Sequence, residues 1–399
     1  MDFIITSLQT WDIEIGSTIK NTALEISKQN RVLYVNTPMD YSSYLRGNKK
    51  SLSYLRRMEV IKKKTSPLRQ LNENMWVLDC PFILPSINHL PTILFNFFNR
   101  QNNRRIGLWI VKQAASLEFK NCIHLIDTDI YRSRYLKEFI HPAISIYYRR
   151  DYIIGESYWR KHGTRLEPEL AASANIVLAN STRFAAELQV YNPNTYPIET
   201  GVNLQLYDAS REYEIPTDIN NIPHPIVGYM GTVNSTRLDG DLLYEIIMRR
   251  PQYNFVFTGP EDEGFRQHRI HSLKNVFFPG QKKVDELPAY IAAYDTCINP
   301  QIVNDITDGN YPLKIDEYLA MGKPTVATST HTMRDVFADY TYLATDLEEW
   351  LAAIDKAVSK SGNKELANQR IAFAQTHSWE HSVKKIYDII EMYQKRQKK

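Results

Sequence analysis

The chain has 399 residues, of which 43% are hydrophobic and 23% charged, and its formal net charge is +3. This length suits two domains of about 200 residues each. The small net charge excludes the strongly basic character typical of nucleic-acid-binding proteins, so we expect no nucleic-acid partner. Cys80, Cys122 and Cys297 are too few and too widely spaced for a disulfide framework or a zinc site. We therefore expect a soluble protein of a reducing compartment, the cytoplasm.

The first half of the chain alternates short apolar runs with segments of helical spacing. We expect strands over residues 2–8, 31–36, 75–80, 122–126, 143–148 and 175–179, and helices over 17–28, 105–119, 131–139 and 168–174. Short strands that alternate with helices of about 10–15 residues are typical of βαβ units and a parallel sheet. The apolar stretch 90–98 is too short to span a bilayer, which needs roughly 18–20 residues.

The second half repeats this rhythm after a polar, proline-bearing stretch. Strands are expected over 225–230, 253–258, 275–278, 296–299 and 324–328, and helices over 239–249, 285–294 and 312–321. The pattern predicts an α/β protein with Rossmann-like domains at 1–206 and 225–376, a linker at 207–224 and a last helical segment at 377–399. Ligands of such sheets bind beyond the carboxyl ends of the strands, so the cleft between the two domains is the expected active site.

The most informative segment is 310–327, where a loop leads through Pro312 into a helix that ends at Gly322. A helix N-terminus offers unpaired N–H groups and partial positive charge, which suits a diphosphate. Lys314 and Glu317 are three residues apart and share one helix face. Lys314 would add a full positive charge, and Glu317 could accept hydrogen bonds from both hydroxyls of a ribose. The alternative is that the two form only a surface salt bridge.

The run from Pro312 to Ala327 resembles the signature helix of glycosyltransferase family 4, whose members are retaining enzymes of the GT-B fold. The likeness extends to further segments at 174–181, 199–203, 228–232, 257–260, 275–280 and 287–290. Residues 378–380, Ser-Trp-Glu, resemble the segment where these chains cross back to the N-terminal domain. The resemblance implies two parallel sheets that face each other across a cleft, with the C-terminal helix returning to the first domain.

The resemblance also implies roles for single residues. Glu317 matches the acidic residue that holds the nucleotide ribose, and Lys314 stands where a basic residue can reach the donor phosphates. The turn at 278–280 matches a backbone site for the nucleobase. Gly16 matches the flexible glycine of the first N-domain loop and is expected on the acceptor side. The expected donor-binding residues are Gly231, Thr232, Arg237, Phe278, Gly280, Asn310, Tyr311, Pro312, Leu313, Lys314 and Glu317.

Three departures from the family pattern stand out. Gly309 occupies the position eight before Glu317 where a second glutamate is usual, and the usual phosphate clamp after Thr232 is missing, with Arg237 the nearest candidate. Residues 148–151, Tyr-Arg-Arg-Asp, replace a catalytic histidine.

Arg149, Arg150 and Asp151 close a strand of the first domain. We expect Arg149 and Asp151, with Lys314, to be catalytic, and Arg149 and Arg150 to lie on the acceptor side, because arginine binds anions in a bidentate manner. The alternative is a structural Arg–Asp pair at a loop mouth.

Asp127 and Asp129 match the Asp-x-Asp metal motif of another glycosyltransferase fold, but strand-end aspartates commonly cap the next helix. We expect no metal and no cofactor.

Residues 46–64 contain eight basic residues against one acid, Glu59, with apolar residues interleaved. This composition predicts contact with an anionic membrane surface or a lipid-phosphate acceptor; a mobile, solvated loop is the alternative. The expected location is therefore cytoplasmic, with contact at the inner face of the membrane.

The resemblance to glycosyltransferase family 4 implies a retaining glycosyltransferase, and we expect it to act in surface polysaccharide synthesis. It would move a hexosyl unit from a nucleoside-diphosphate sugar, of the UDP or GDP type, to a glycan or lipid-linked acceptor. Two alternatives stay open: a GT-B nucleotide-sugar epimerase, and a non-catalytic subunit that binds a nucleotide-sugar.

Overall fold

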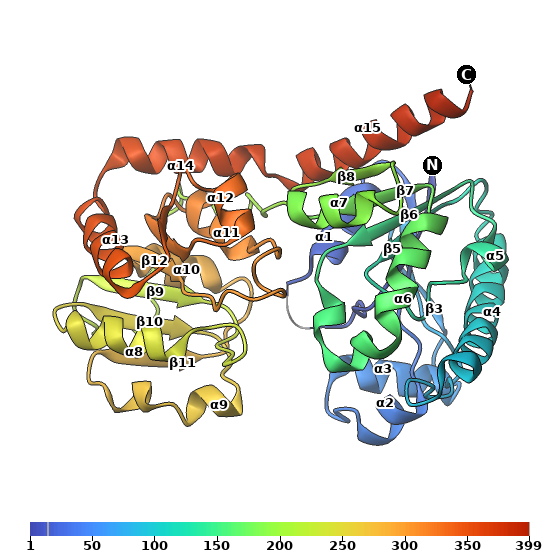
Figure 1. Ribbon diagram of the computed structural model, residues 1–399, viewed down its shortest axis with the longest axis horizontal. Coiled ribbons are helices and arrows are strands. Elements are labelled where there is room, and N and C mark those ends of the chain that lie inside the picture. Colours follow the sequence, from blue (N-terminus) through green and yellow to red (C-terminus); the bar gives the residue numbers. More distant parts are fainter. Residues whose placement is uncertain (14–15, 399) are drawn as a thin grey trace. The chain divides into compact units, whose positions relative to one another are not determined.

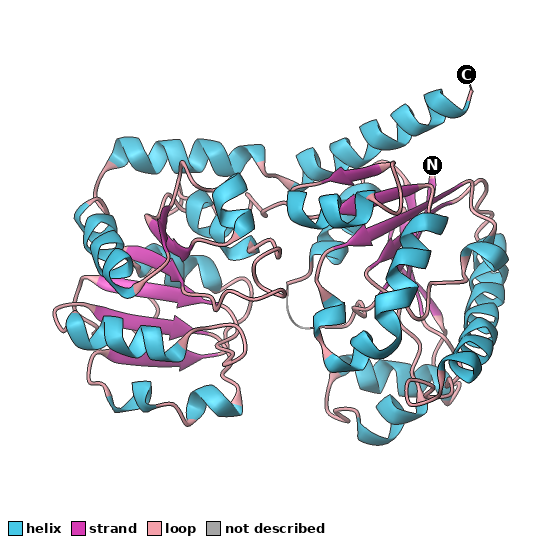
Figure 2. Cartoon of the chain, in the orientation of Figure 1, coloured by secondary structure: helices cyan, strands magenta, loops and turns pink. Residues whose placement is uncertain are grey.

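The computed structural model describes residues 1–13 and 16–398 and divides the chain into two compact units, each built on one sheet (Figures 1 and 2). Unit 1 comprises Met1–Ile198 and the described residues from Val383 onward, and unit 2 comprises Glu199–Ser382. The predicted α/β architecture with two Rossmann-like domains is confirmed.

Unit 1 is built on an eight-stranded sheet. In spatial order the strands are β3 (Leu68–Asn72), β4 (Met75–Leu78), β2 (Arg31–Val35), β1 (Asp2–Ser7), β5 (Ile123–Asp127), β6 (Ile144–Arg149), β7 (Ile176–Ala179) and β8 (Thr195–Pro197). All neighbouring pairs are parallel except β3 with β4. The carboxyl ends of seven strands therefore meet at one edge, and most of their residues are buried on both faces, as in other parallel sheets.

Helices cover both faces of this sheet. Their bounds are α1 (Thr18–Ser27), α2 (Tyr41–Arg46), α3 (Leu52–Ile61), α4 (Thr92–Ser116), α5 (Lys137–Ile140), α6 (Ser157–Ser173), α7 (Thr182–Gln189) and α15 (Trp379–Gln397). One face packs against α1 and against α15, which contributes Val383, Ile386, Ile389 and Ile390 at helical spacing. The other face packs against α4 and α6. The prediction that the C-terminal helix returns to the first domain is confirmed (Figure 1).

Unit 2 is built on a six-stranded sheet whose neighbouring pairs are all parallel. Its order is β11 (Val276–Gly280), β10 (Asn254–Thr258), β9 (Ile226–Met230), β12 (Thr296–Asn299), β13 (Thr325–Thr328) and β14 (Tyr342–Ala344). The helices of unit 2 are α8 (Gly240–Arg249), α9 (Glu263–Arg266), α10 (Leu287–Ala293), α11 (Leu313–Ala320), α12 (His331–Val336), α13 (Leu347–Ser359) and α14 (Lys364–Thr376). Helices α8 and α13 pack on one face, and α10 and α11 on the other.

The segment predicted as a linker, 207–224, is a packed part of unit 2. Tyr207, Ile219 and Ile222 are buried in the core under α10 and α11. The carboxylate of Asp218 accepts hydrogen bonds from Lys282 at 2.6 Å and from the hydroxyl of Tyr290 at 2.7 Å. Polarity and prolines predicted an irregular backbone, but they could not reveal these scattered apolar anchors.

Several helices differ from the predicted bounds. Helix α4 begins at Thr92 rather than at residue 105, and α6 begins at Ser157 rather than at 168, with Pro168 inside it. Periodicity missed the first half of α4 because its apolar side chains, such as Ile93 and Phe97, are exposed rather than aligned on the buried side. Of the helix predicted at 131–139, only Lys137–Ile140 is helical.

Candidate functional site

The carboxyl edge of the unit 2 sheet is shaped by two glycines that follow β9 and β10. Gly231 and Gly259 have φ values of +131° and +152°, which side-chain-bearing residues rarely adopt. A Cβ on Gly259 would lie 2.0 Å from the carbonyl oxygen of Gly231, and a Cβ on Gly231 would lie 2.9 Å from Nζ of Lys314. The glycines therefore let two turns pass each other and leave room for the lysine.

Helix α11 places its first turn at this edge. Pro312 stands at the N-cap position, and no side chain caps the first turn. Leu313 opens the helix, and the buried residues Ile315, Tyr318 and Leu319 hold it on the core. The first turn thus presents the partial positive charge of the helix N-terminus, as predicted.

Lys314 is held against Tyr229, the residue of β9 two positions before Gly231. Its ammonium donates a hydrogen bond to the Tyr229 hydroxyl at 2.6 Å and lies 4.0 Å from the ring centroid. The Tyr229 hydroxyl in turn donates to the carbonyl oxygen of Thr232 at 3.0 Å. Burial lowers the pKa of Lys314 to about 7, although the nearby Glu317 raises it.

Glu317 lies one turn further along α11 and is held by Tyr207, whose hydroxyl donates a hydrogen bond to the carboxylate. Burial raises the pKa of Glu317 to about 7, against the opposing effects of Tyr207 and Lys314. The pair is thus partly buried and electrostatically coupled, rather than a surface salt bridge. Both groups change protonation near neutral pH.

Arg237 supplies a second cation to the same edge. Its charge is close enough to lower the pKa of Lys314, yet its side chain is exposed and makes no hydrogen bond or ion pair with any described residue. Thr232 is exposed beside it. Two cations, a glycine turn and an uncapped helix N-terminus therefore meet at one place, an arrangement that suits a phosphate group.

Tyr311 serves to anchor α11 rather than to face a ligand. Its hydroxyl donates to Oδ2 of Asp316 at 2.7 Å, and Oδ1 of Asp316 lies 2.8 Å from Nδ1 of His377. This buried cluster ties the helix to the end of α14. Sequence reasoning missed Asp316 and His377, although Asp316 stands inside the signature run.

Two buried asparagines near α11 have polar atoms without partners among the described residues. They are Oδ1 of Asn310 and both side-chain polar atoms of Asn299, the last residue of β12. Asn310 was predicted as a donor-binding residue, whereas nothing in the sequence pattern singled out Asn299. Unpaired buried amides are costly, so the unpaired oxygen of Asn310, two residues before the N-cap of α11, agrees with a polar site there.

The predicted nucleobase turn lies at the end of β11. The ring of Phe278 stacks between His271, at 4.1 Å, and Phe257, at 5.4 Å, so its side chain is already engaged. Gly280 has φ +77°, and a Cβ there would meet no atom within 4 Å. The part of this turn that remains accessible to a ligand is therefore its backbone at Gly280.

Arg149 lies in the interior of unit 1, where it is only 2% exposed. Its guanidinium lies 2.9 Å from Glu187 and 3.5 Å from Glu167, and it packs 4.4 Å from the ring centroid of Phe184. These contacts place Arg149 in a structural ion-pair cluster with two glutamates, rather than in the Arg–Asp pair that was the alternative interpretation.

Arg150 forms a buried ion pair with Asp127, whose Oδ2 also accepts a hydrogen bond from Ser7 at 2.6 Å. Asp151 is more exposed and lies 3.9 Å from Arg150. Asp129 accepts a hydrogen bond from the backbone N–H of Arg132 at 3.0 Å, as a turn-capping residue does. Throughout residues 1–13 and 16–398, no group of three or more His, Cys, Asp or Glu side chains is arranged to hold a metal ion.

Gly16, the predicted flexible glycine, is exposed, and a Cβ there would meet no atom within 4 Å.

The basic segment 46–64 contains helix α3 at its centre, and its lysines lie in the turns on either side of that helix. Arg56 turns inward, with Nε 3.3 Å from the carboxylate of Asp79, while the lysines at 49, 50, 62, 63 and 64 are exposed. Two leucine side chains of α2 and α3 are exposed as well: Leu45 is 66% exposed and Leu55 is 47% exposed. In the described part of the chain, no helix has the length and apolar character needed to cross a membrane.

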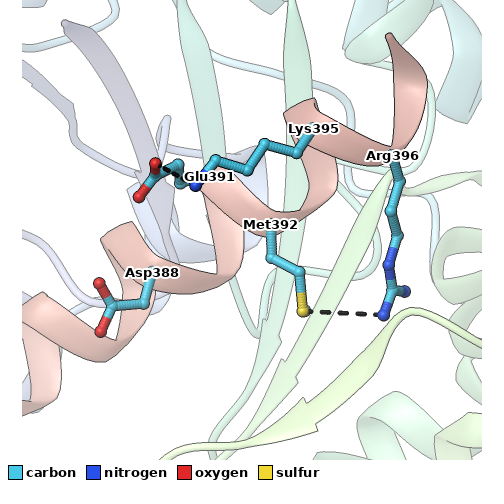
Figure 3. A pocket seen from close by; sticks show the side chains of 5 residues that line it. All are labelled: Asp388, Glu391, Met392, Lys395 and Arg396. Carbon is cyan, nitrogen blue, oxygen red and sulfur yellow. Dashed lines mark hydrogen bonds and ion pairs between the residues drawn. The ribbon is translucent and has the colours of Figure 1, made fainter. Parts of the chain in front are cut away.

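A separate hollow of about 300 Å³ lies along α15 (Figure 3). It is lined by Asp388, Glu391, Met392, Lys395 and Arg396. Lys395 pairs with Glu391 at 2.6 Å within the same helix. The hollow contains none of the predicted site residues, so we do not assign it to the functional site.

Comparison with known proteins gives two sequence matches. Residues 224–360 match the model of the family "Glycosyl transferases group 1". The putative teichuronic acid biosynthesis glycosyltransferase TuaH of Bacillus subtilis (strain 168) is 27% identical over 192 residues. That match covers 46% of this chain and 47% of TuaH, so it spans about half the length of this curated relative.

Solved structures match over nearly the whole chain at low identity. Anabaena Alr3699/HepE in complex with UDP has a TM-score of 0.67 at 14% identity, and the match covers 98% of this chain and 100% of that one. Sucrose-phosphate synthase from Thermosynechococcus elongatus has a TM-score of 0.69 at 14% identity, with 98% of each chain covered. At these identities the likeness establishes the fold. The chain therefore has the GT-B fold, and its residues 224–360 resemble the group 1 glycosyltransferases.

Proposed function

We propose that the protein is a retaining glycosyltransferase whose nucleoside-diphosphate sugar binds at the carboxyl edge of the unit 2 sheet. The observation that carries this proposal is the meeting of Lys314, Arg237, the Gly231 turn and the first turn of α11 at one place. These features supply positive charge where a diphosphate would lie. Glu317, one turn deeper, would accept hydrogen bonds from a ribose.

A uridine nucleotide is the first donor to test. Alr3699/HepE, which shares the fold, has been crystallised with UDP and with UDP-glucose. A GDP-sugar is the second possibility. The backbone of the turn at Gly280 would contact the base, and Phe278 would support that turn from behind. We propose that no metal is needed, because Lys314 and Arg237 can neutralise the diphosphate.

In the proposed reaction the bond between C1 of the hexosyl unit and the diphosphate oxygen breaks. A bond from C1 to an acceptor hydroxyl oxygen forms on the same face, and the acceptor proton passes to the departing diphosphate. Lys314 and Arg237 would stabilise the negative charge that develops on the leaving group. The protein would otherwise act by holding the reactants in position.

The acceptor class is a glycan or lipid-linked glycan of surface polysaccharide synthesis. This part of the proposal is supported by the 27% identity to TuaH, a putative teichuronic acid biosynthesis glycosyltransferase. An epimerase or a non-catalytic subunit would bind the same donor. Both would differ from a transferase in that an added acceptor would gain no sugar.

We further propose that unit 1 contacts an anionic membrane surface through α2, α3 and the start of α4. The exposed lysines that flank α3 supply positive charge. Ile93 and Phe97 on α4 are 84% and 59% exposed and would enter the headgroup region. The protein would work at the inner face of the cell membrane.

Donor binding gives the first test. In a thermal-shift screen of UDP, GDP, ADP, CMP and dTDP without metal, we expect one diphosphate, UDP foremost, to raise the melting temperature. Glu317→Gln should weaken the affinity for that nucleotide by about tenfold or more, because hydrogen bonds to a charged carboxylate are lost. Glu365→Gln, an exposed glutamate of unit 2, is the matched control. Unchanged affinity in Glu317→Gln would remove this residue from the site.

Proton uptake tests the role of Lys314. Its pKa of about 7 leaves it mostly neutral at pH 8, where the diphosphate is fully ionised. A bound diphosphate favours the ammonium form, so calorimetry in buffers of different ionisation enthalpy should show uptake approaching one proton. Lys314→Arg keeps the positive charge and should bind without proton uptake. Binding by the unsubstituted protein without uptake at pH 8 would contradict this assignment.

Vesicle sedimentation tests the membrane contact. The protein should bind vesicles that contain an anionic phospholipid and should dissociate from them at high salt. It should not bind vesicles of phosphatidylcholine alone. Replacing Lys62, Lys63 and Lys64 by Gln should weaken binding, since each lysine near the surface contributes about 1 kcal/mol. Replacing the exposed Lys112 and Lys120 should have little effect. Binding that persists unchanged at high salt would refute the electrostatic contact.

A further inference from the structure

Two arginines of unit 1, Arg57 and Arg132, lie near the carboxyl edge of its sheet and have Thr37 as a common neighbour. Arg57 is part of α3, whose Ser53 reaches the loop after β1 through a hydrogen bond to Thr10 at 2.7 Å. Arg132 lies in the turns that follow β5. Both side chains are partly buried.

Neither arginine has a carboxylate partner among the described residues, in contrast to their neighbours. Arg56 pairs with Asp79 and Arg150 pairs with Asp127. The guanidinium of Arg57 donates only to carbonyl oxygens, those of Ser53 at 3.1 Å and Thr37 at 3.4 Å.

The surroundings of Arg57 disfavour its charge. Burial lowers the pKa of Arg57 and the charge of Arg132 lowers it further, while the charges of Asp79, Asp40 and Asp12 raise it. Two like charges within range of each other, neither in an ion pair with a described residue, are unfavourable in the empty protein. Such an arrangement is typical of sites that receive an anion.

The surroundings of this pair suit a sugar. Arg132 is also the charge that acts most strongly on the hydroxyl of Tyr158, on α6, and Tyr158 is 44% exposed. Arg132 and Asp129 line a small hollow at the strand ends together with Asn36 and Thr37. An exposed aromatic ring offers an apolar surface for the C–H face of a sugar, and the polar groups could bind its hydroxyls.

We infer that Arg57, Arg132 and Tyr158 bind an acidic sugar acceptor, with the two arginines on its anionic group and the tyrosine on its ring. This inference rests on the proposed function and narrows its acceptor to sugars that carry a carboxylate or a phosphate. This inference gives Arg57 a role different from that of the lysines in the basic segment 46–64. Its guanidinium donates a hydrogen bond to Thr37 in the loop after β2, whereas those lysines are exposed to solvent.

Binding of simple acceptor analogues to the full chain tests this site without nucleotide. Methyl β-D-glucuronide supplies a carboxylate, glucose 6-phosphate supplies a phosphate, and methyl β-D-glucoside is neutral. Calorimetry or ligand-observed NMR should show that at least one anionic sugar binds about tenfold more tightly than the neutral one. The preferred anion distinguishes a uronic acid acceptor from a phosphorylated one. Arg57→Gln and Arg132→Gln should each remove most of this preference, whereas Lys112→Gln, at an exposed cation of α4, should preserve it.

Nucleotide binding by the same variants separates this inference from the donor proposal. Both arginine variants should bind UDP as the unsubstituted protein does, which also shows that they are folded. Equal affinity for neutral and anionic sugars, alongside normal UDP binding, would overturn the inference and leave the donor proposal standing. Weaker UDP binding in folded Arg57→Gln or Arg132→Gln would also overturn it, because these residues would then serve the donor. Absence of binding of both UDP and GDP to the unsubstituted protein would refute the donor proposal alone.

Discussion

The candidate site depends on one contact, the hydrogen bond of 2.6 Å between the ammonium of Lys314 and the hydroxyl of Tyr229. It fixes the first turn of α11 beside the end of β9. It also requires Gly231, because a Cβ at that position would collide with the lysine. Burial holds the pKa of Lys314 near 7, and a phosphate that displaced Tyr229 as its partner would restore the charge. The same contact thus positions the lysine and keeps it responsive to an anion.

Much of unit 2 could be predicted from the sequence because local signals there agree with the tertiary structure. Pro312 and Gly322 bracket α11, and short β-branched runs mark the strands on either side of it. The face shared by Lys314 and Glu317 followed from their spacing alone. Their partners did not: Tyr229 lies 85 residues before Lys314, and nothing local connects them. Tyr207 lay in a segment whose polarity predicted only a linker.

Unit 1 illustrates the opposite case, in which a correct local pattern misleads about function. Arg149 and Arg150 do close a strand at the carboxyl edge, where anion-binding residues often lie. Glu167, Glu187 and Asp127 neutralise them there, and no spacing rule reveals which distant carboxylates will fold against a given arginine. The unpaired cations of this edge, Arg57 and Arg132, come instead from a segment predicted for membrane contact and from a turn predicted as helix.

A crystal structure of the full chain soaked with UDP, without added metal, tests the central claim most directly. The account predicts that an oxygen of the diphosphate lies within about 2.7–3.2 Å of Nζ of Lys314, in place of the Tyr229 hydroxyl. The ribose hydroxyls should reach Glu317, and the guanidinium of Arg237 should turn toward the phosphates. A nucleotide bound elsewhere, with Lys314 still on Tyr229, would contradict the account.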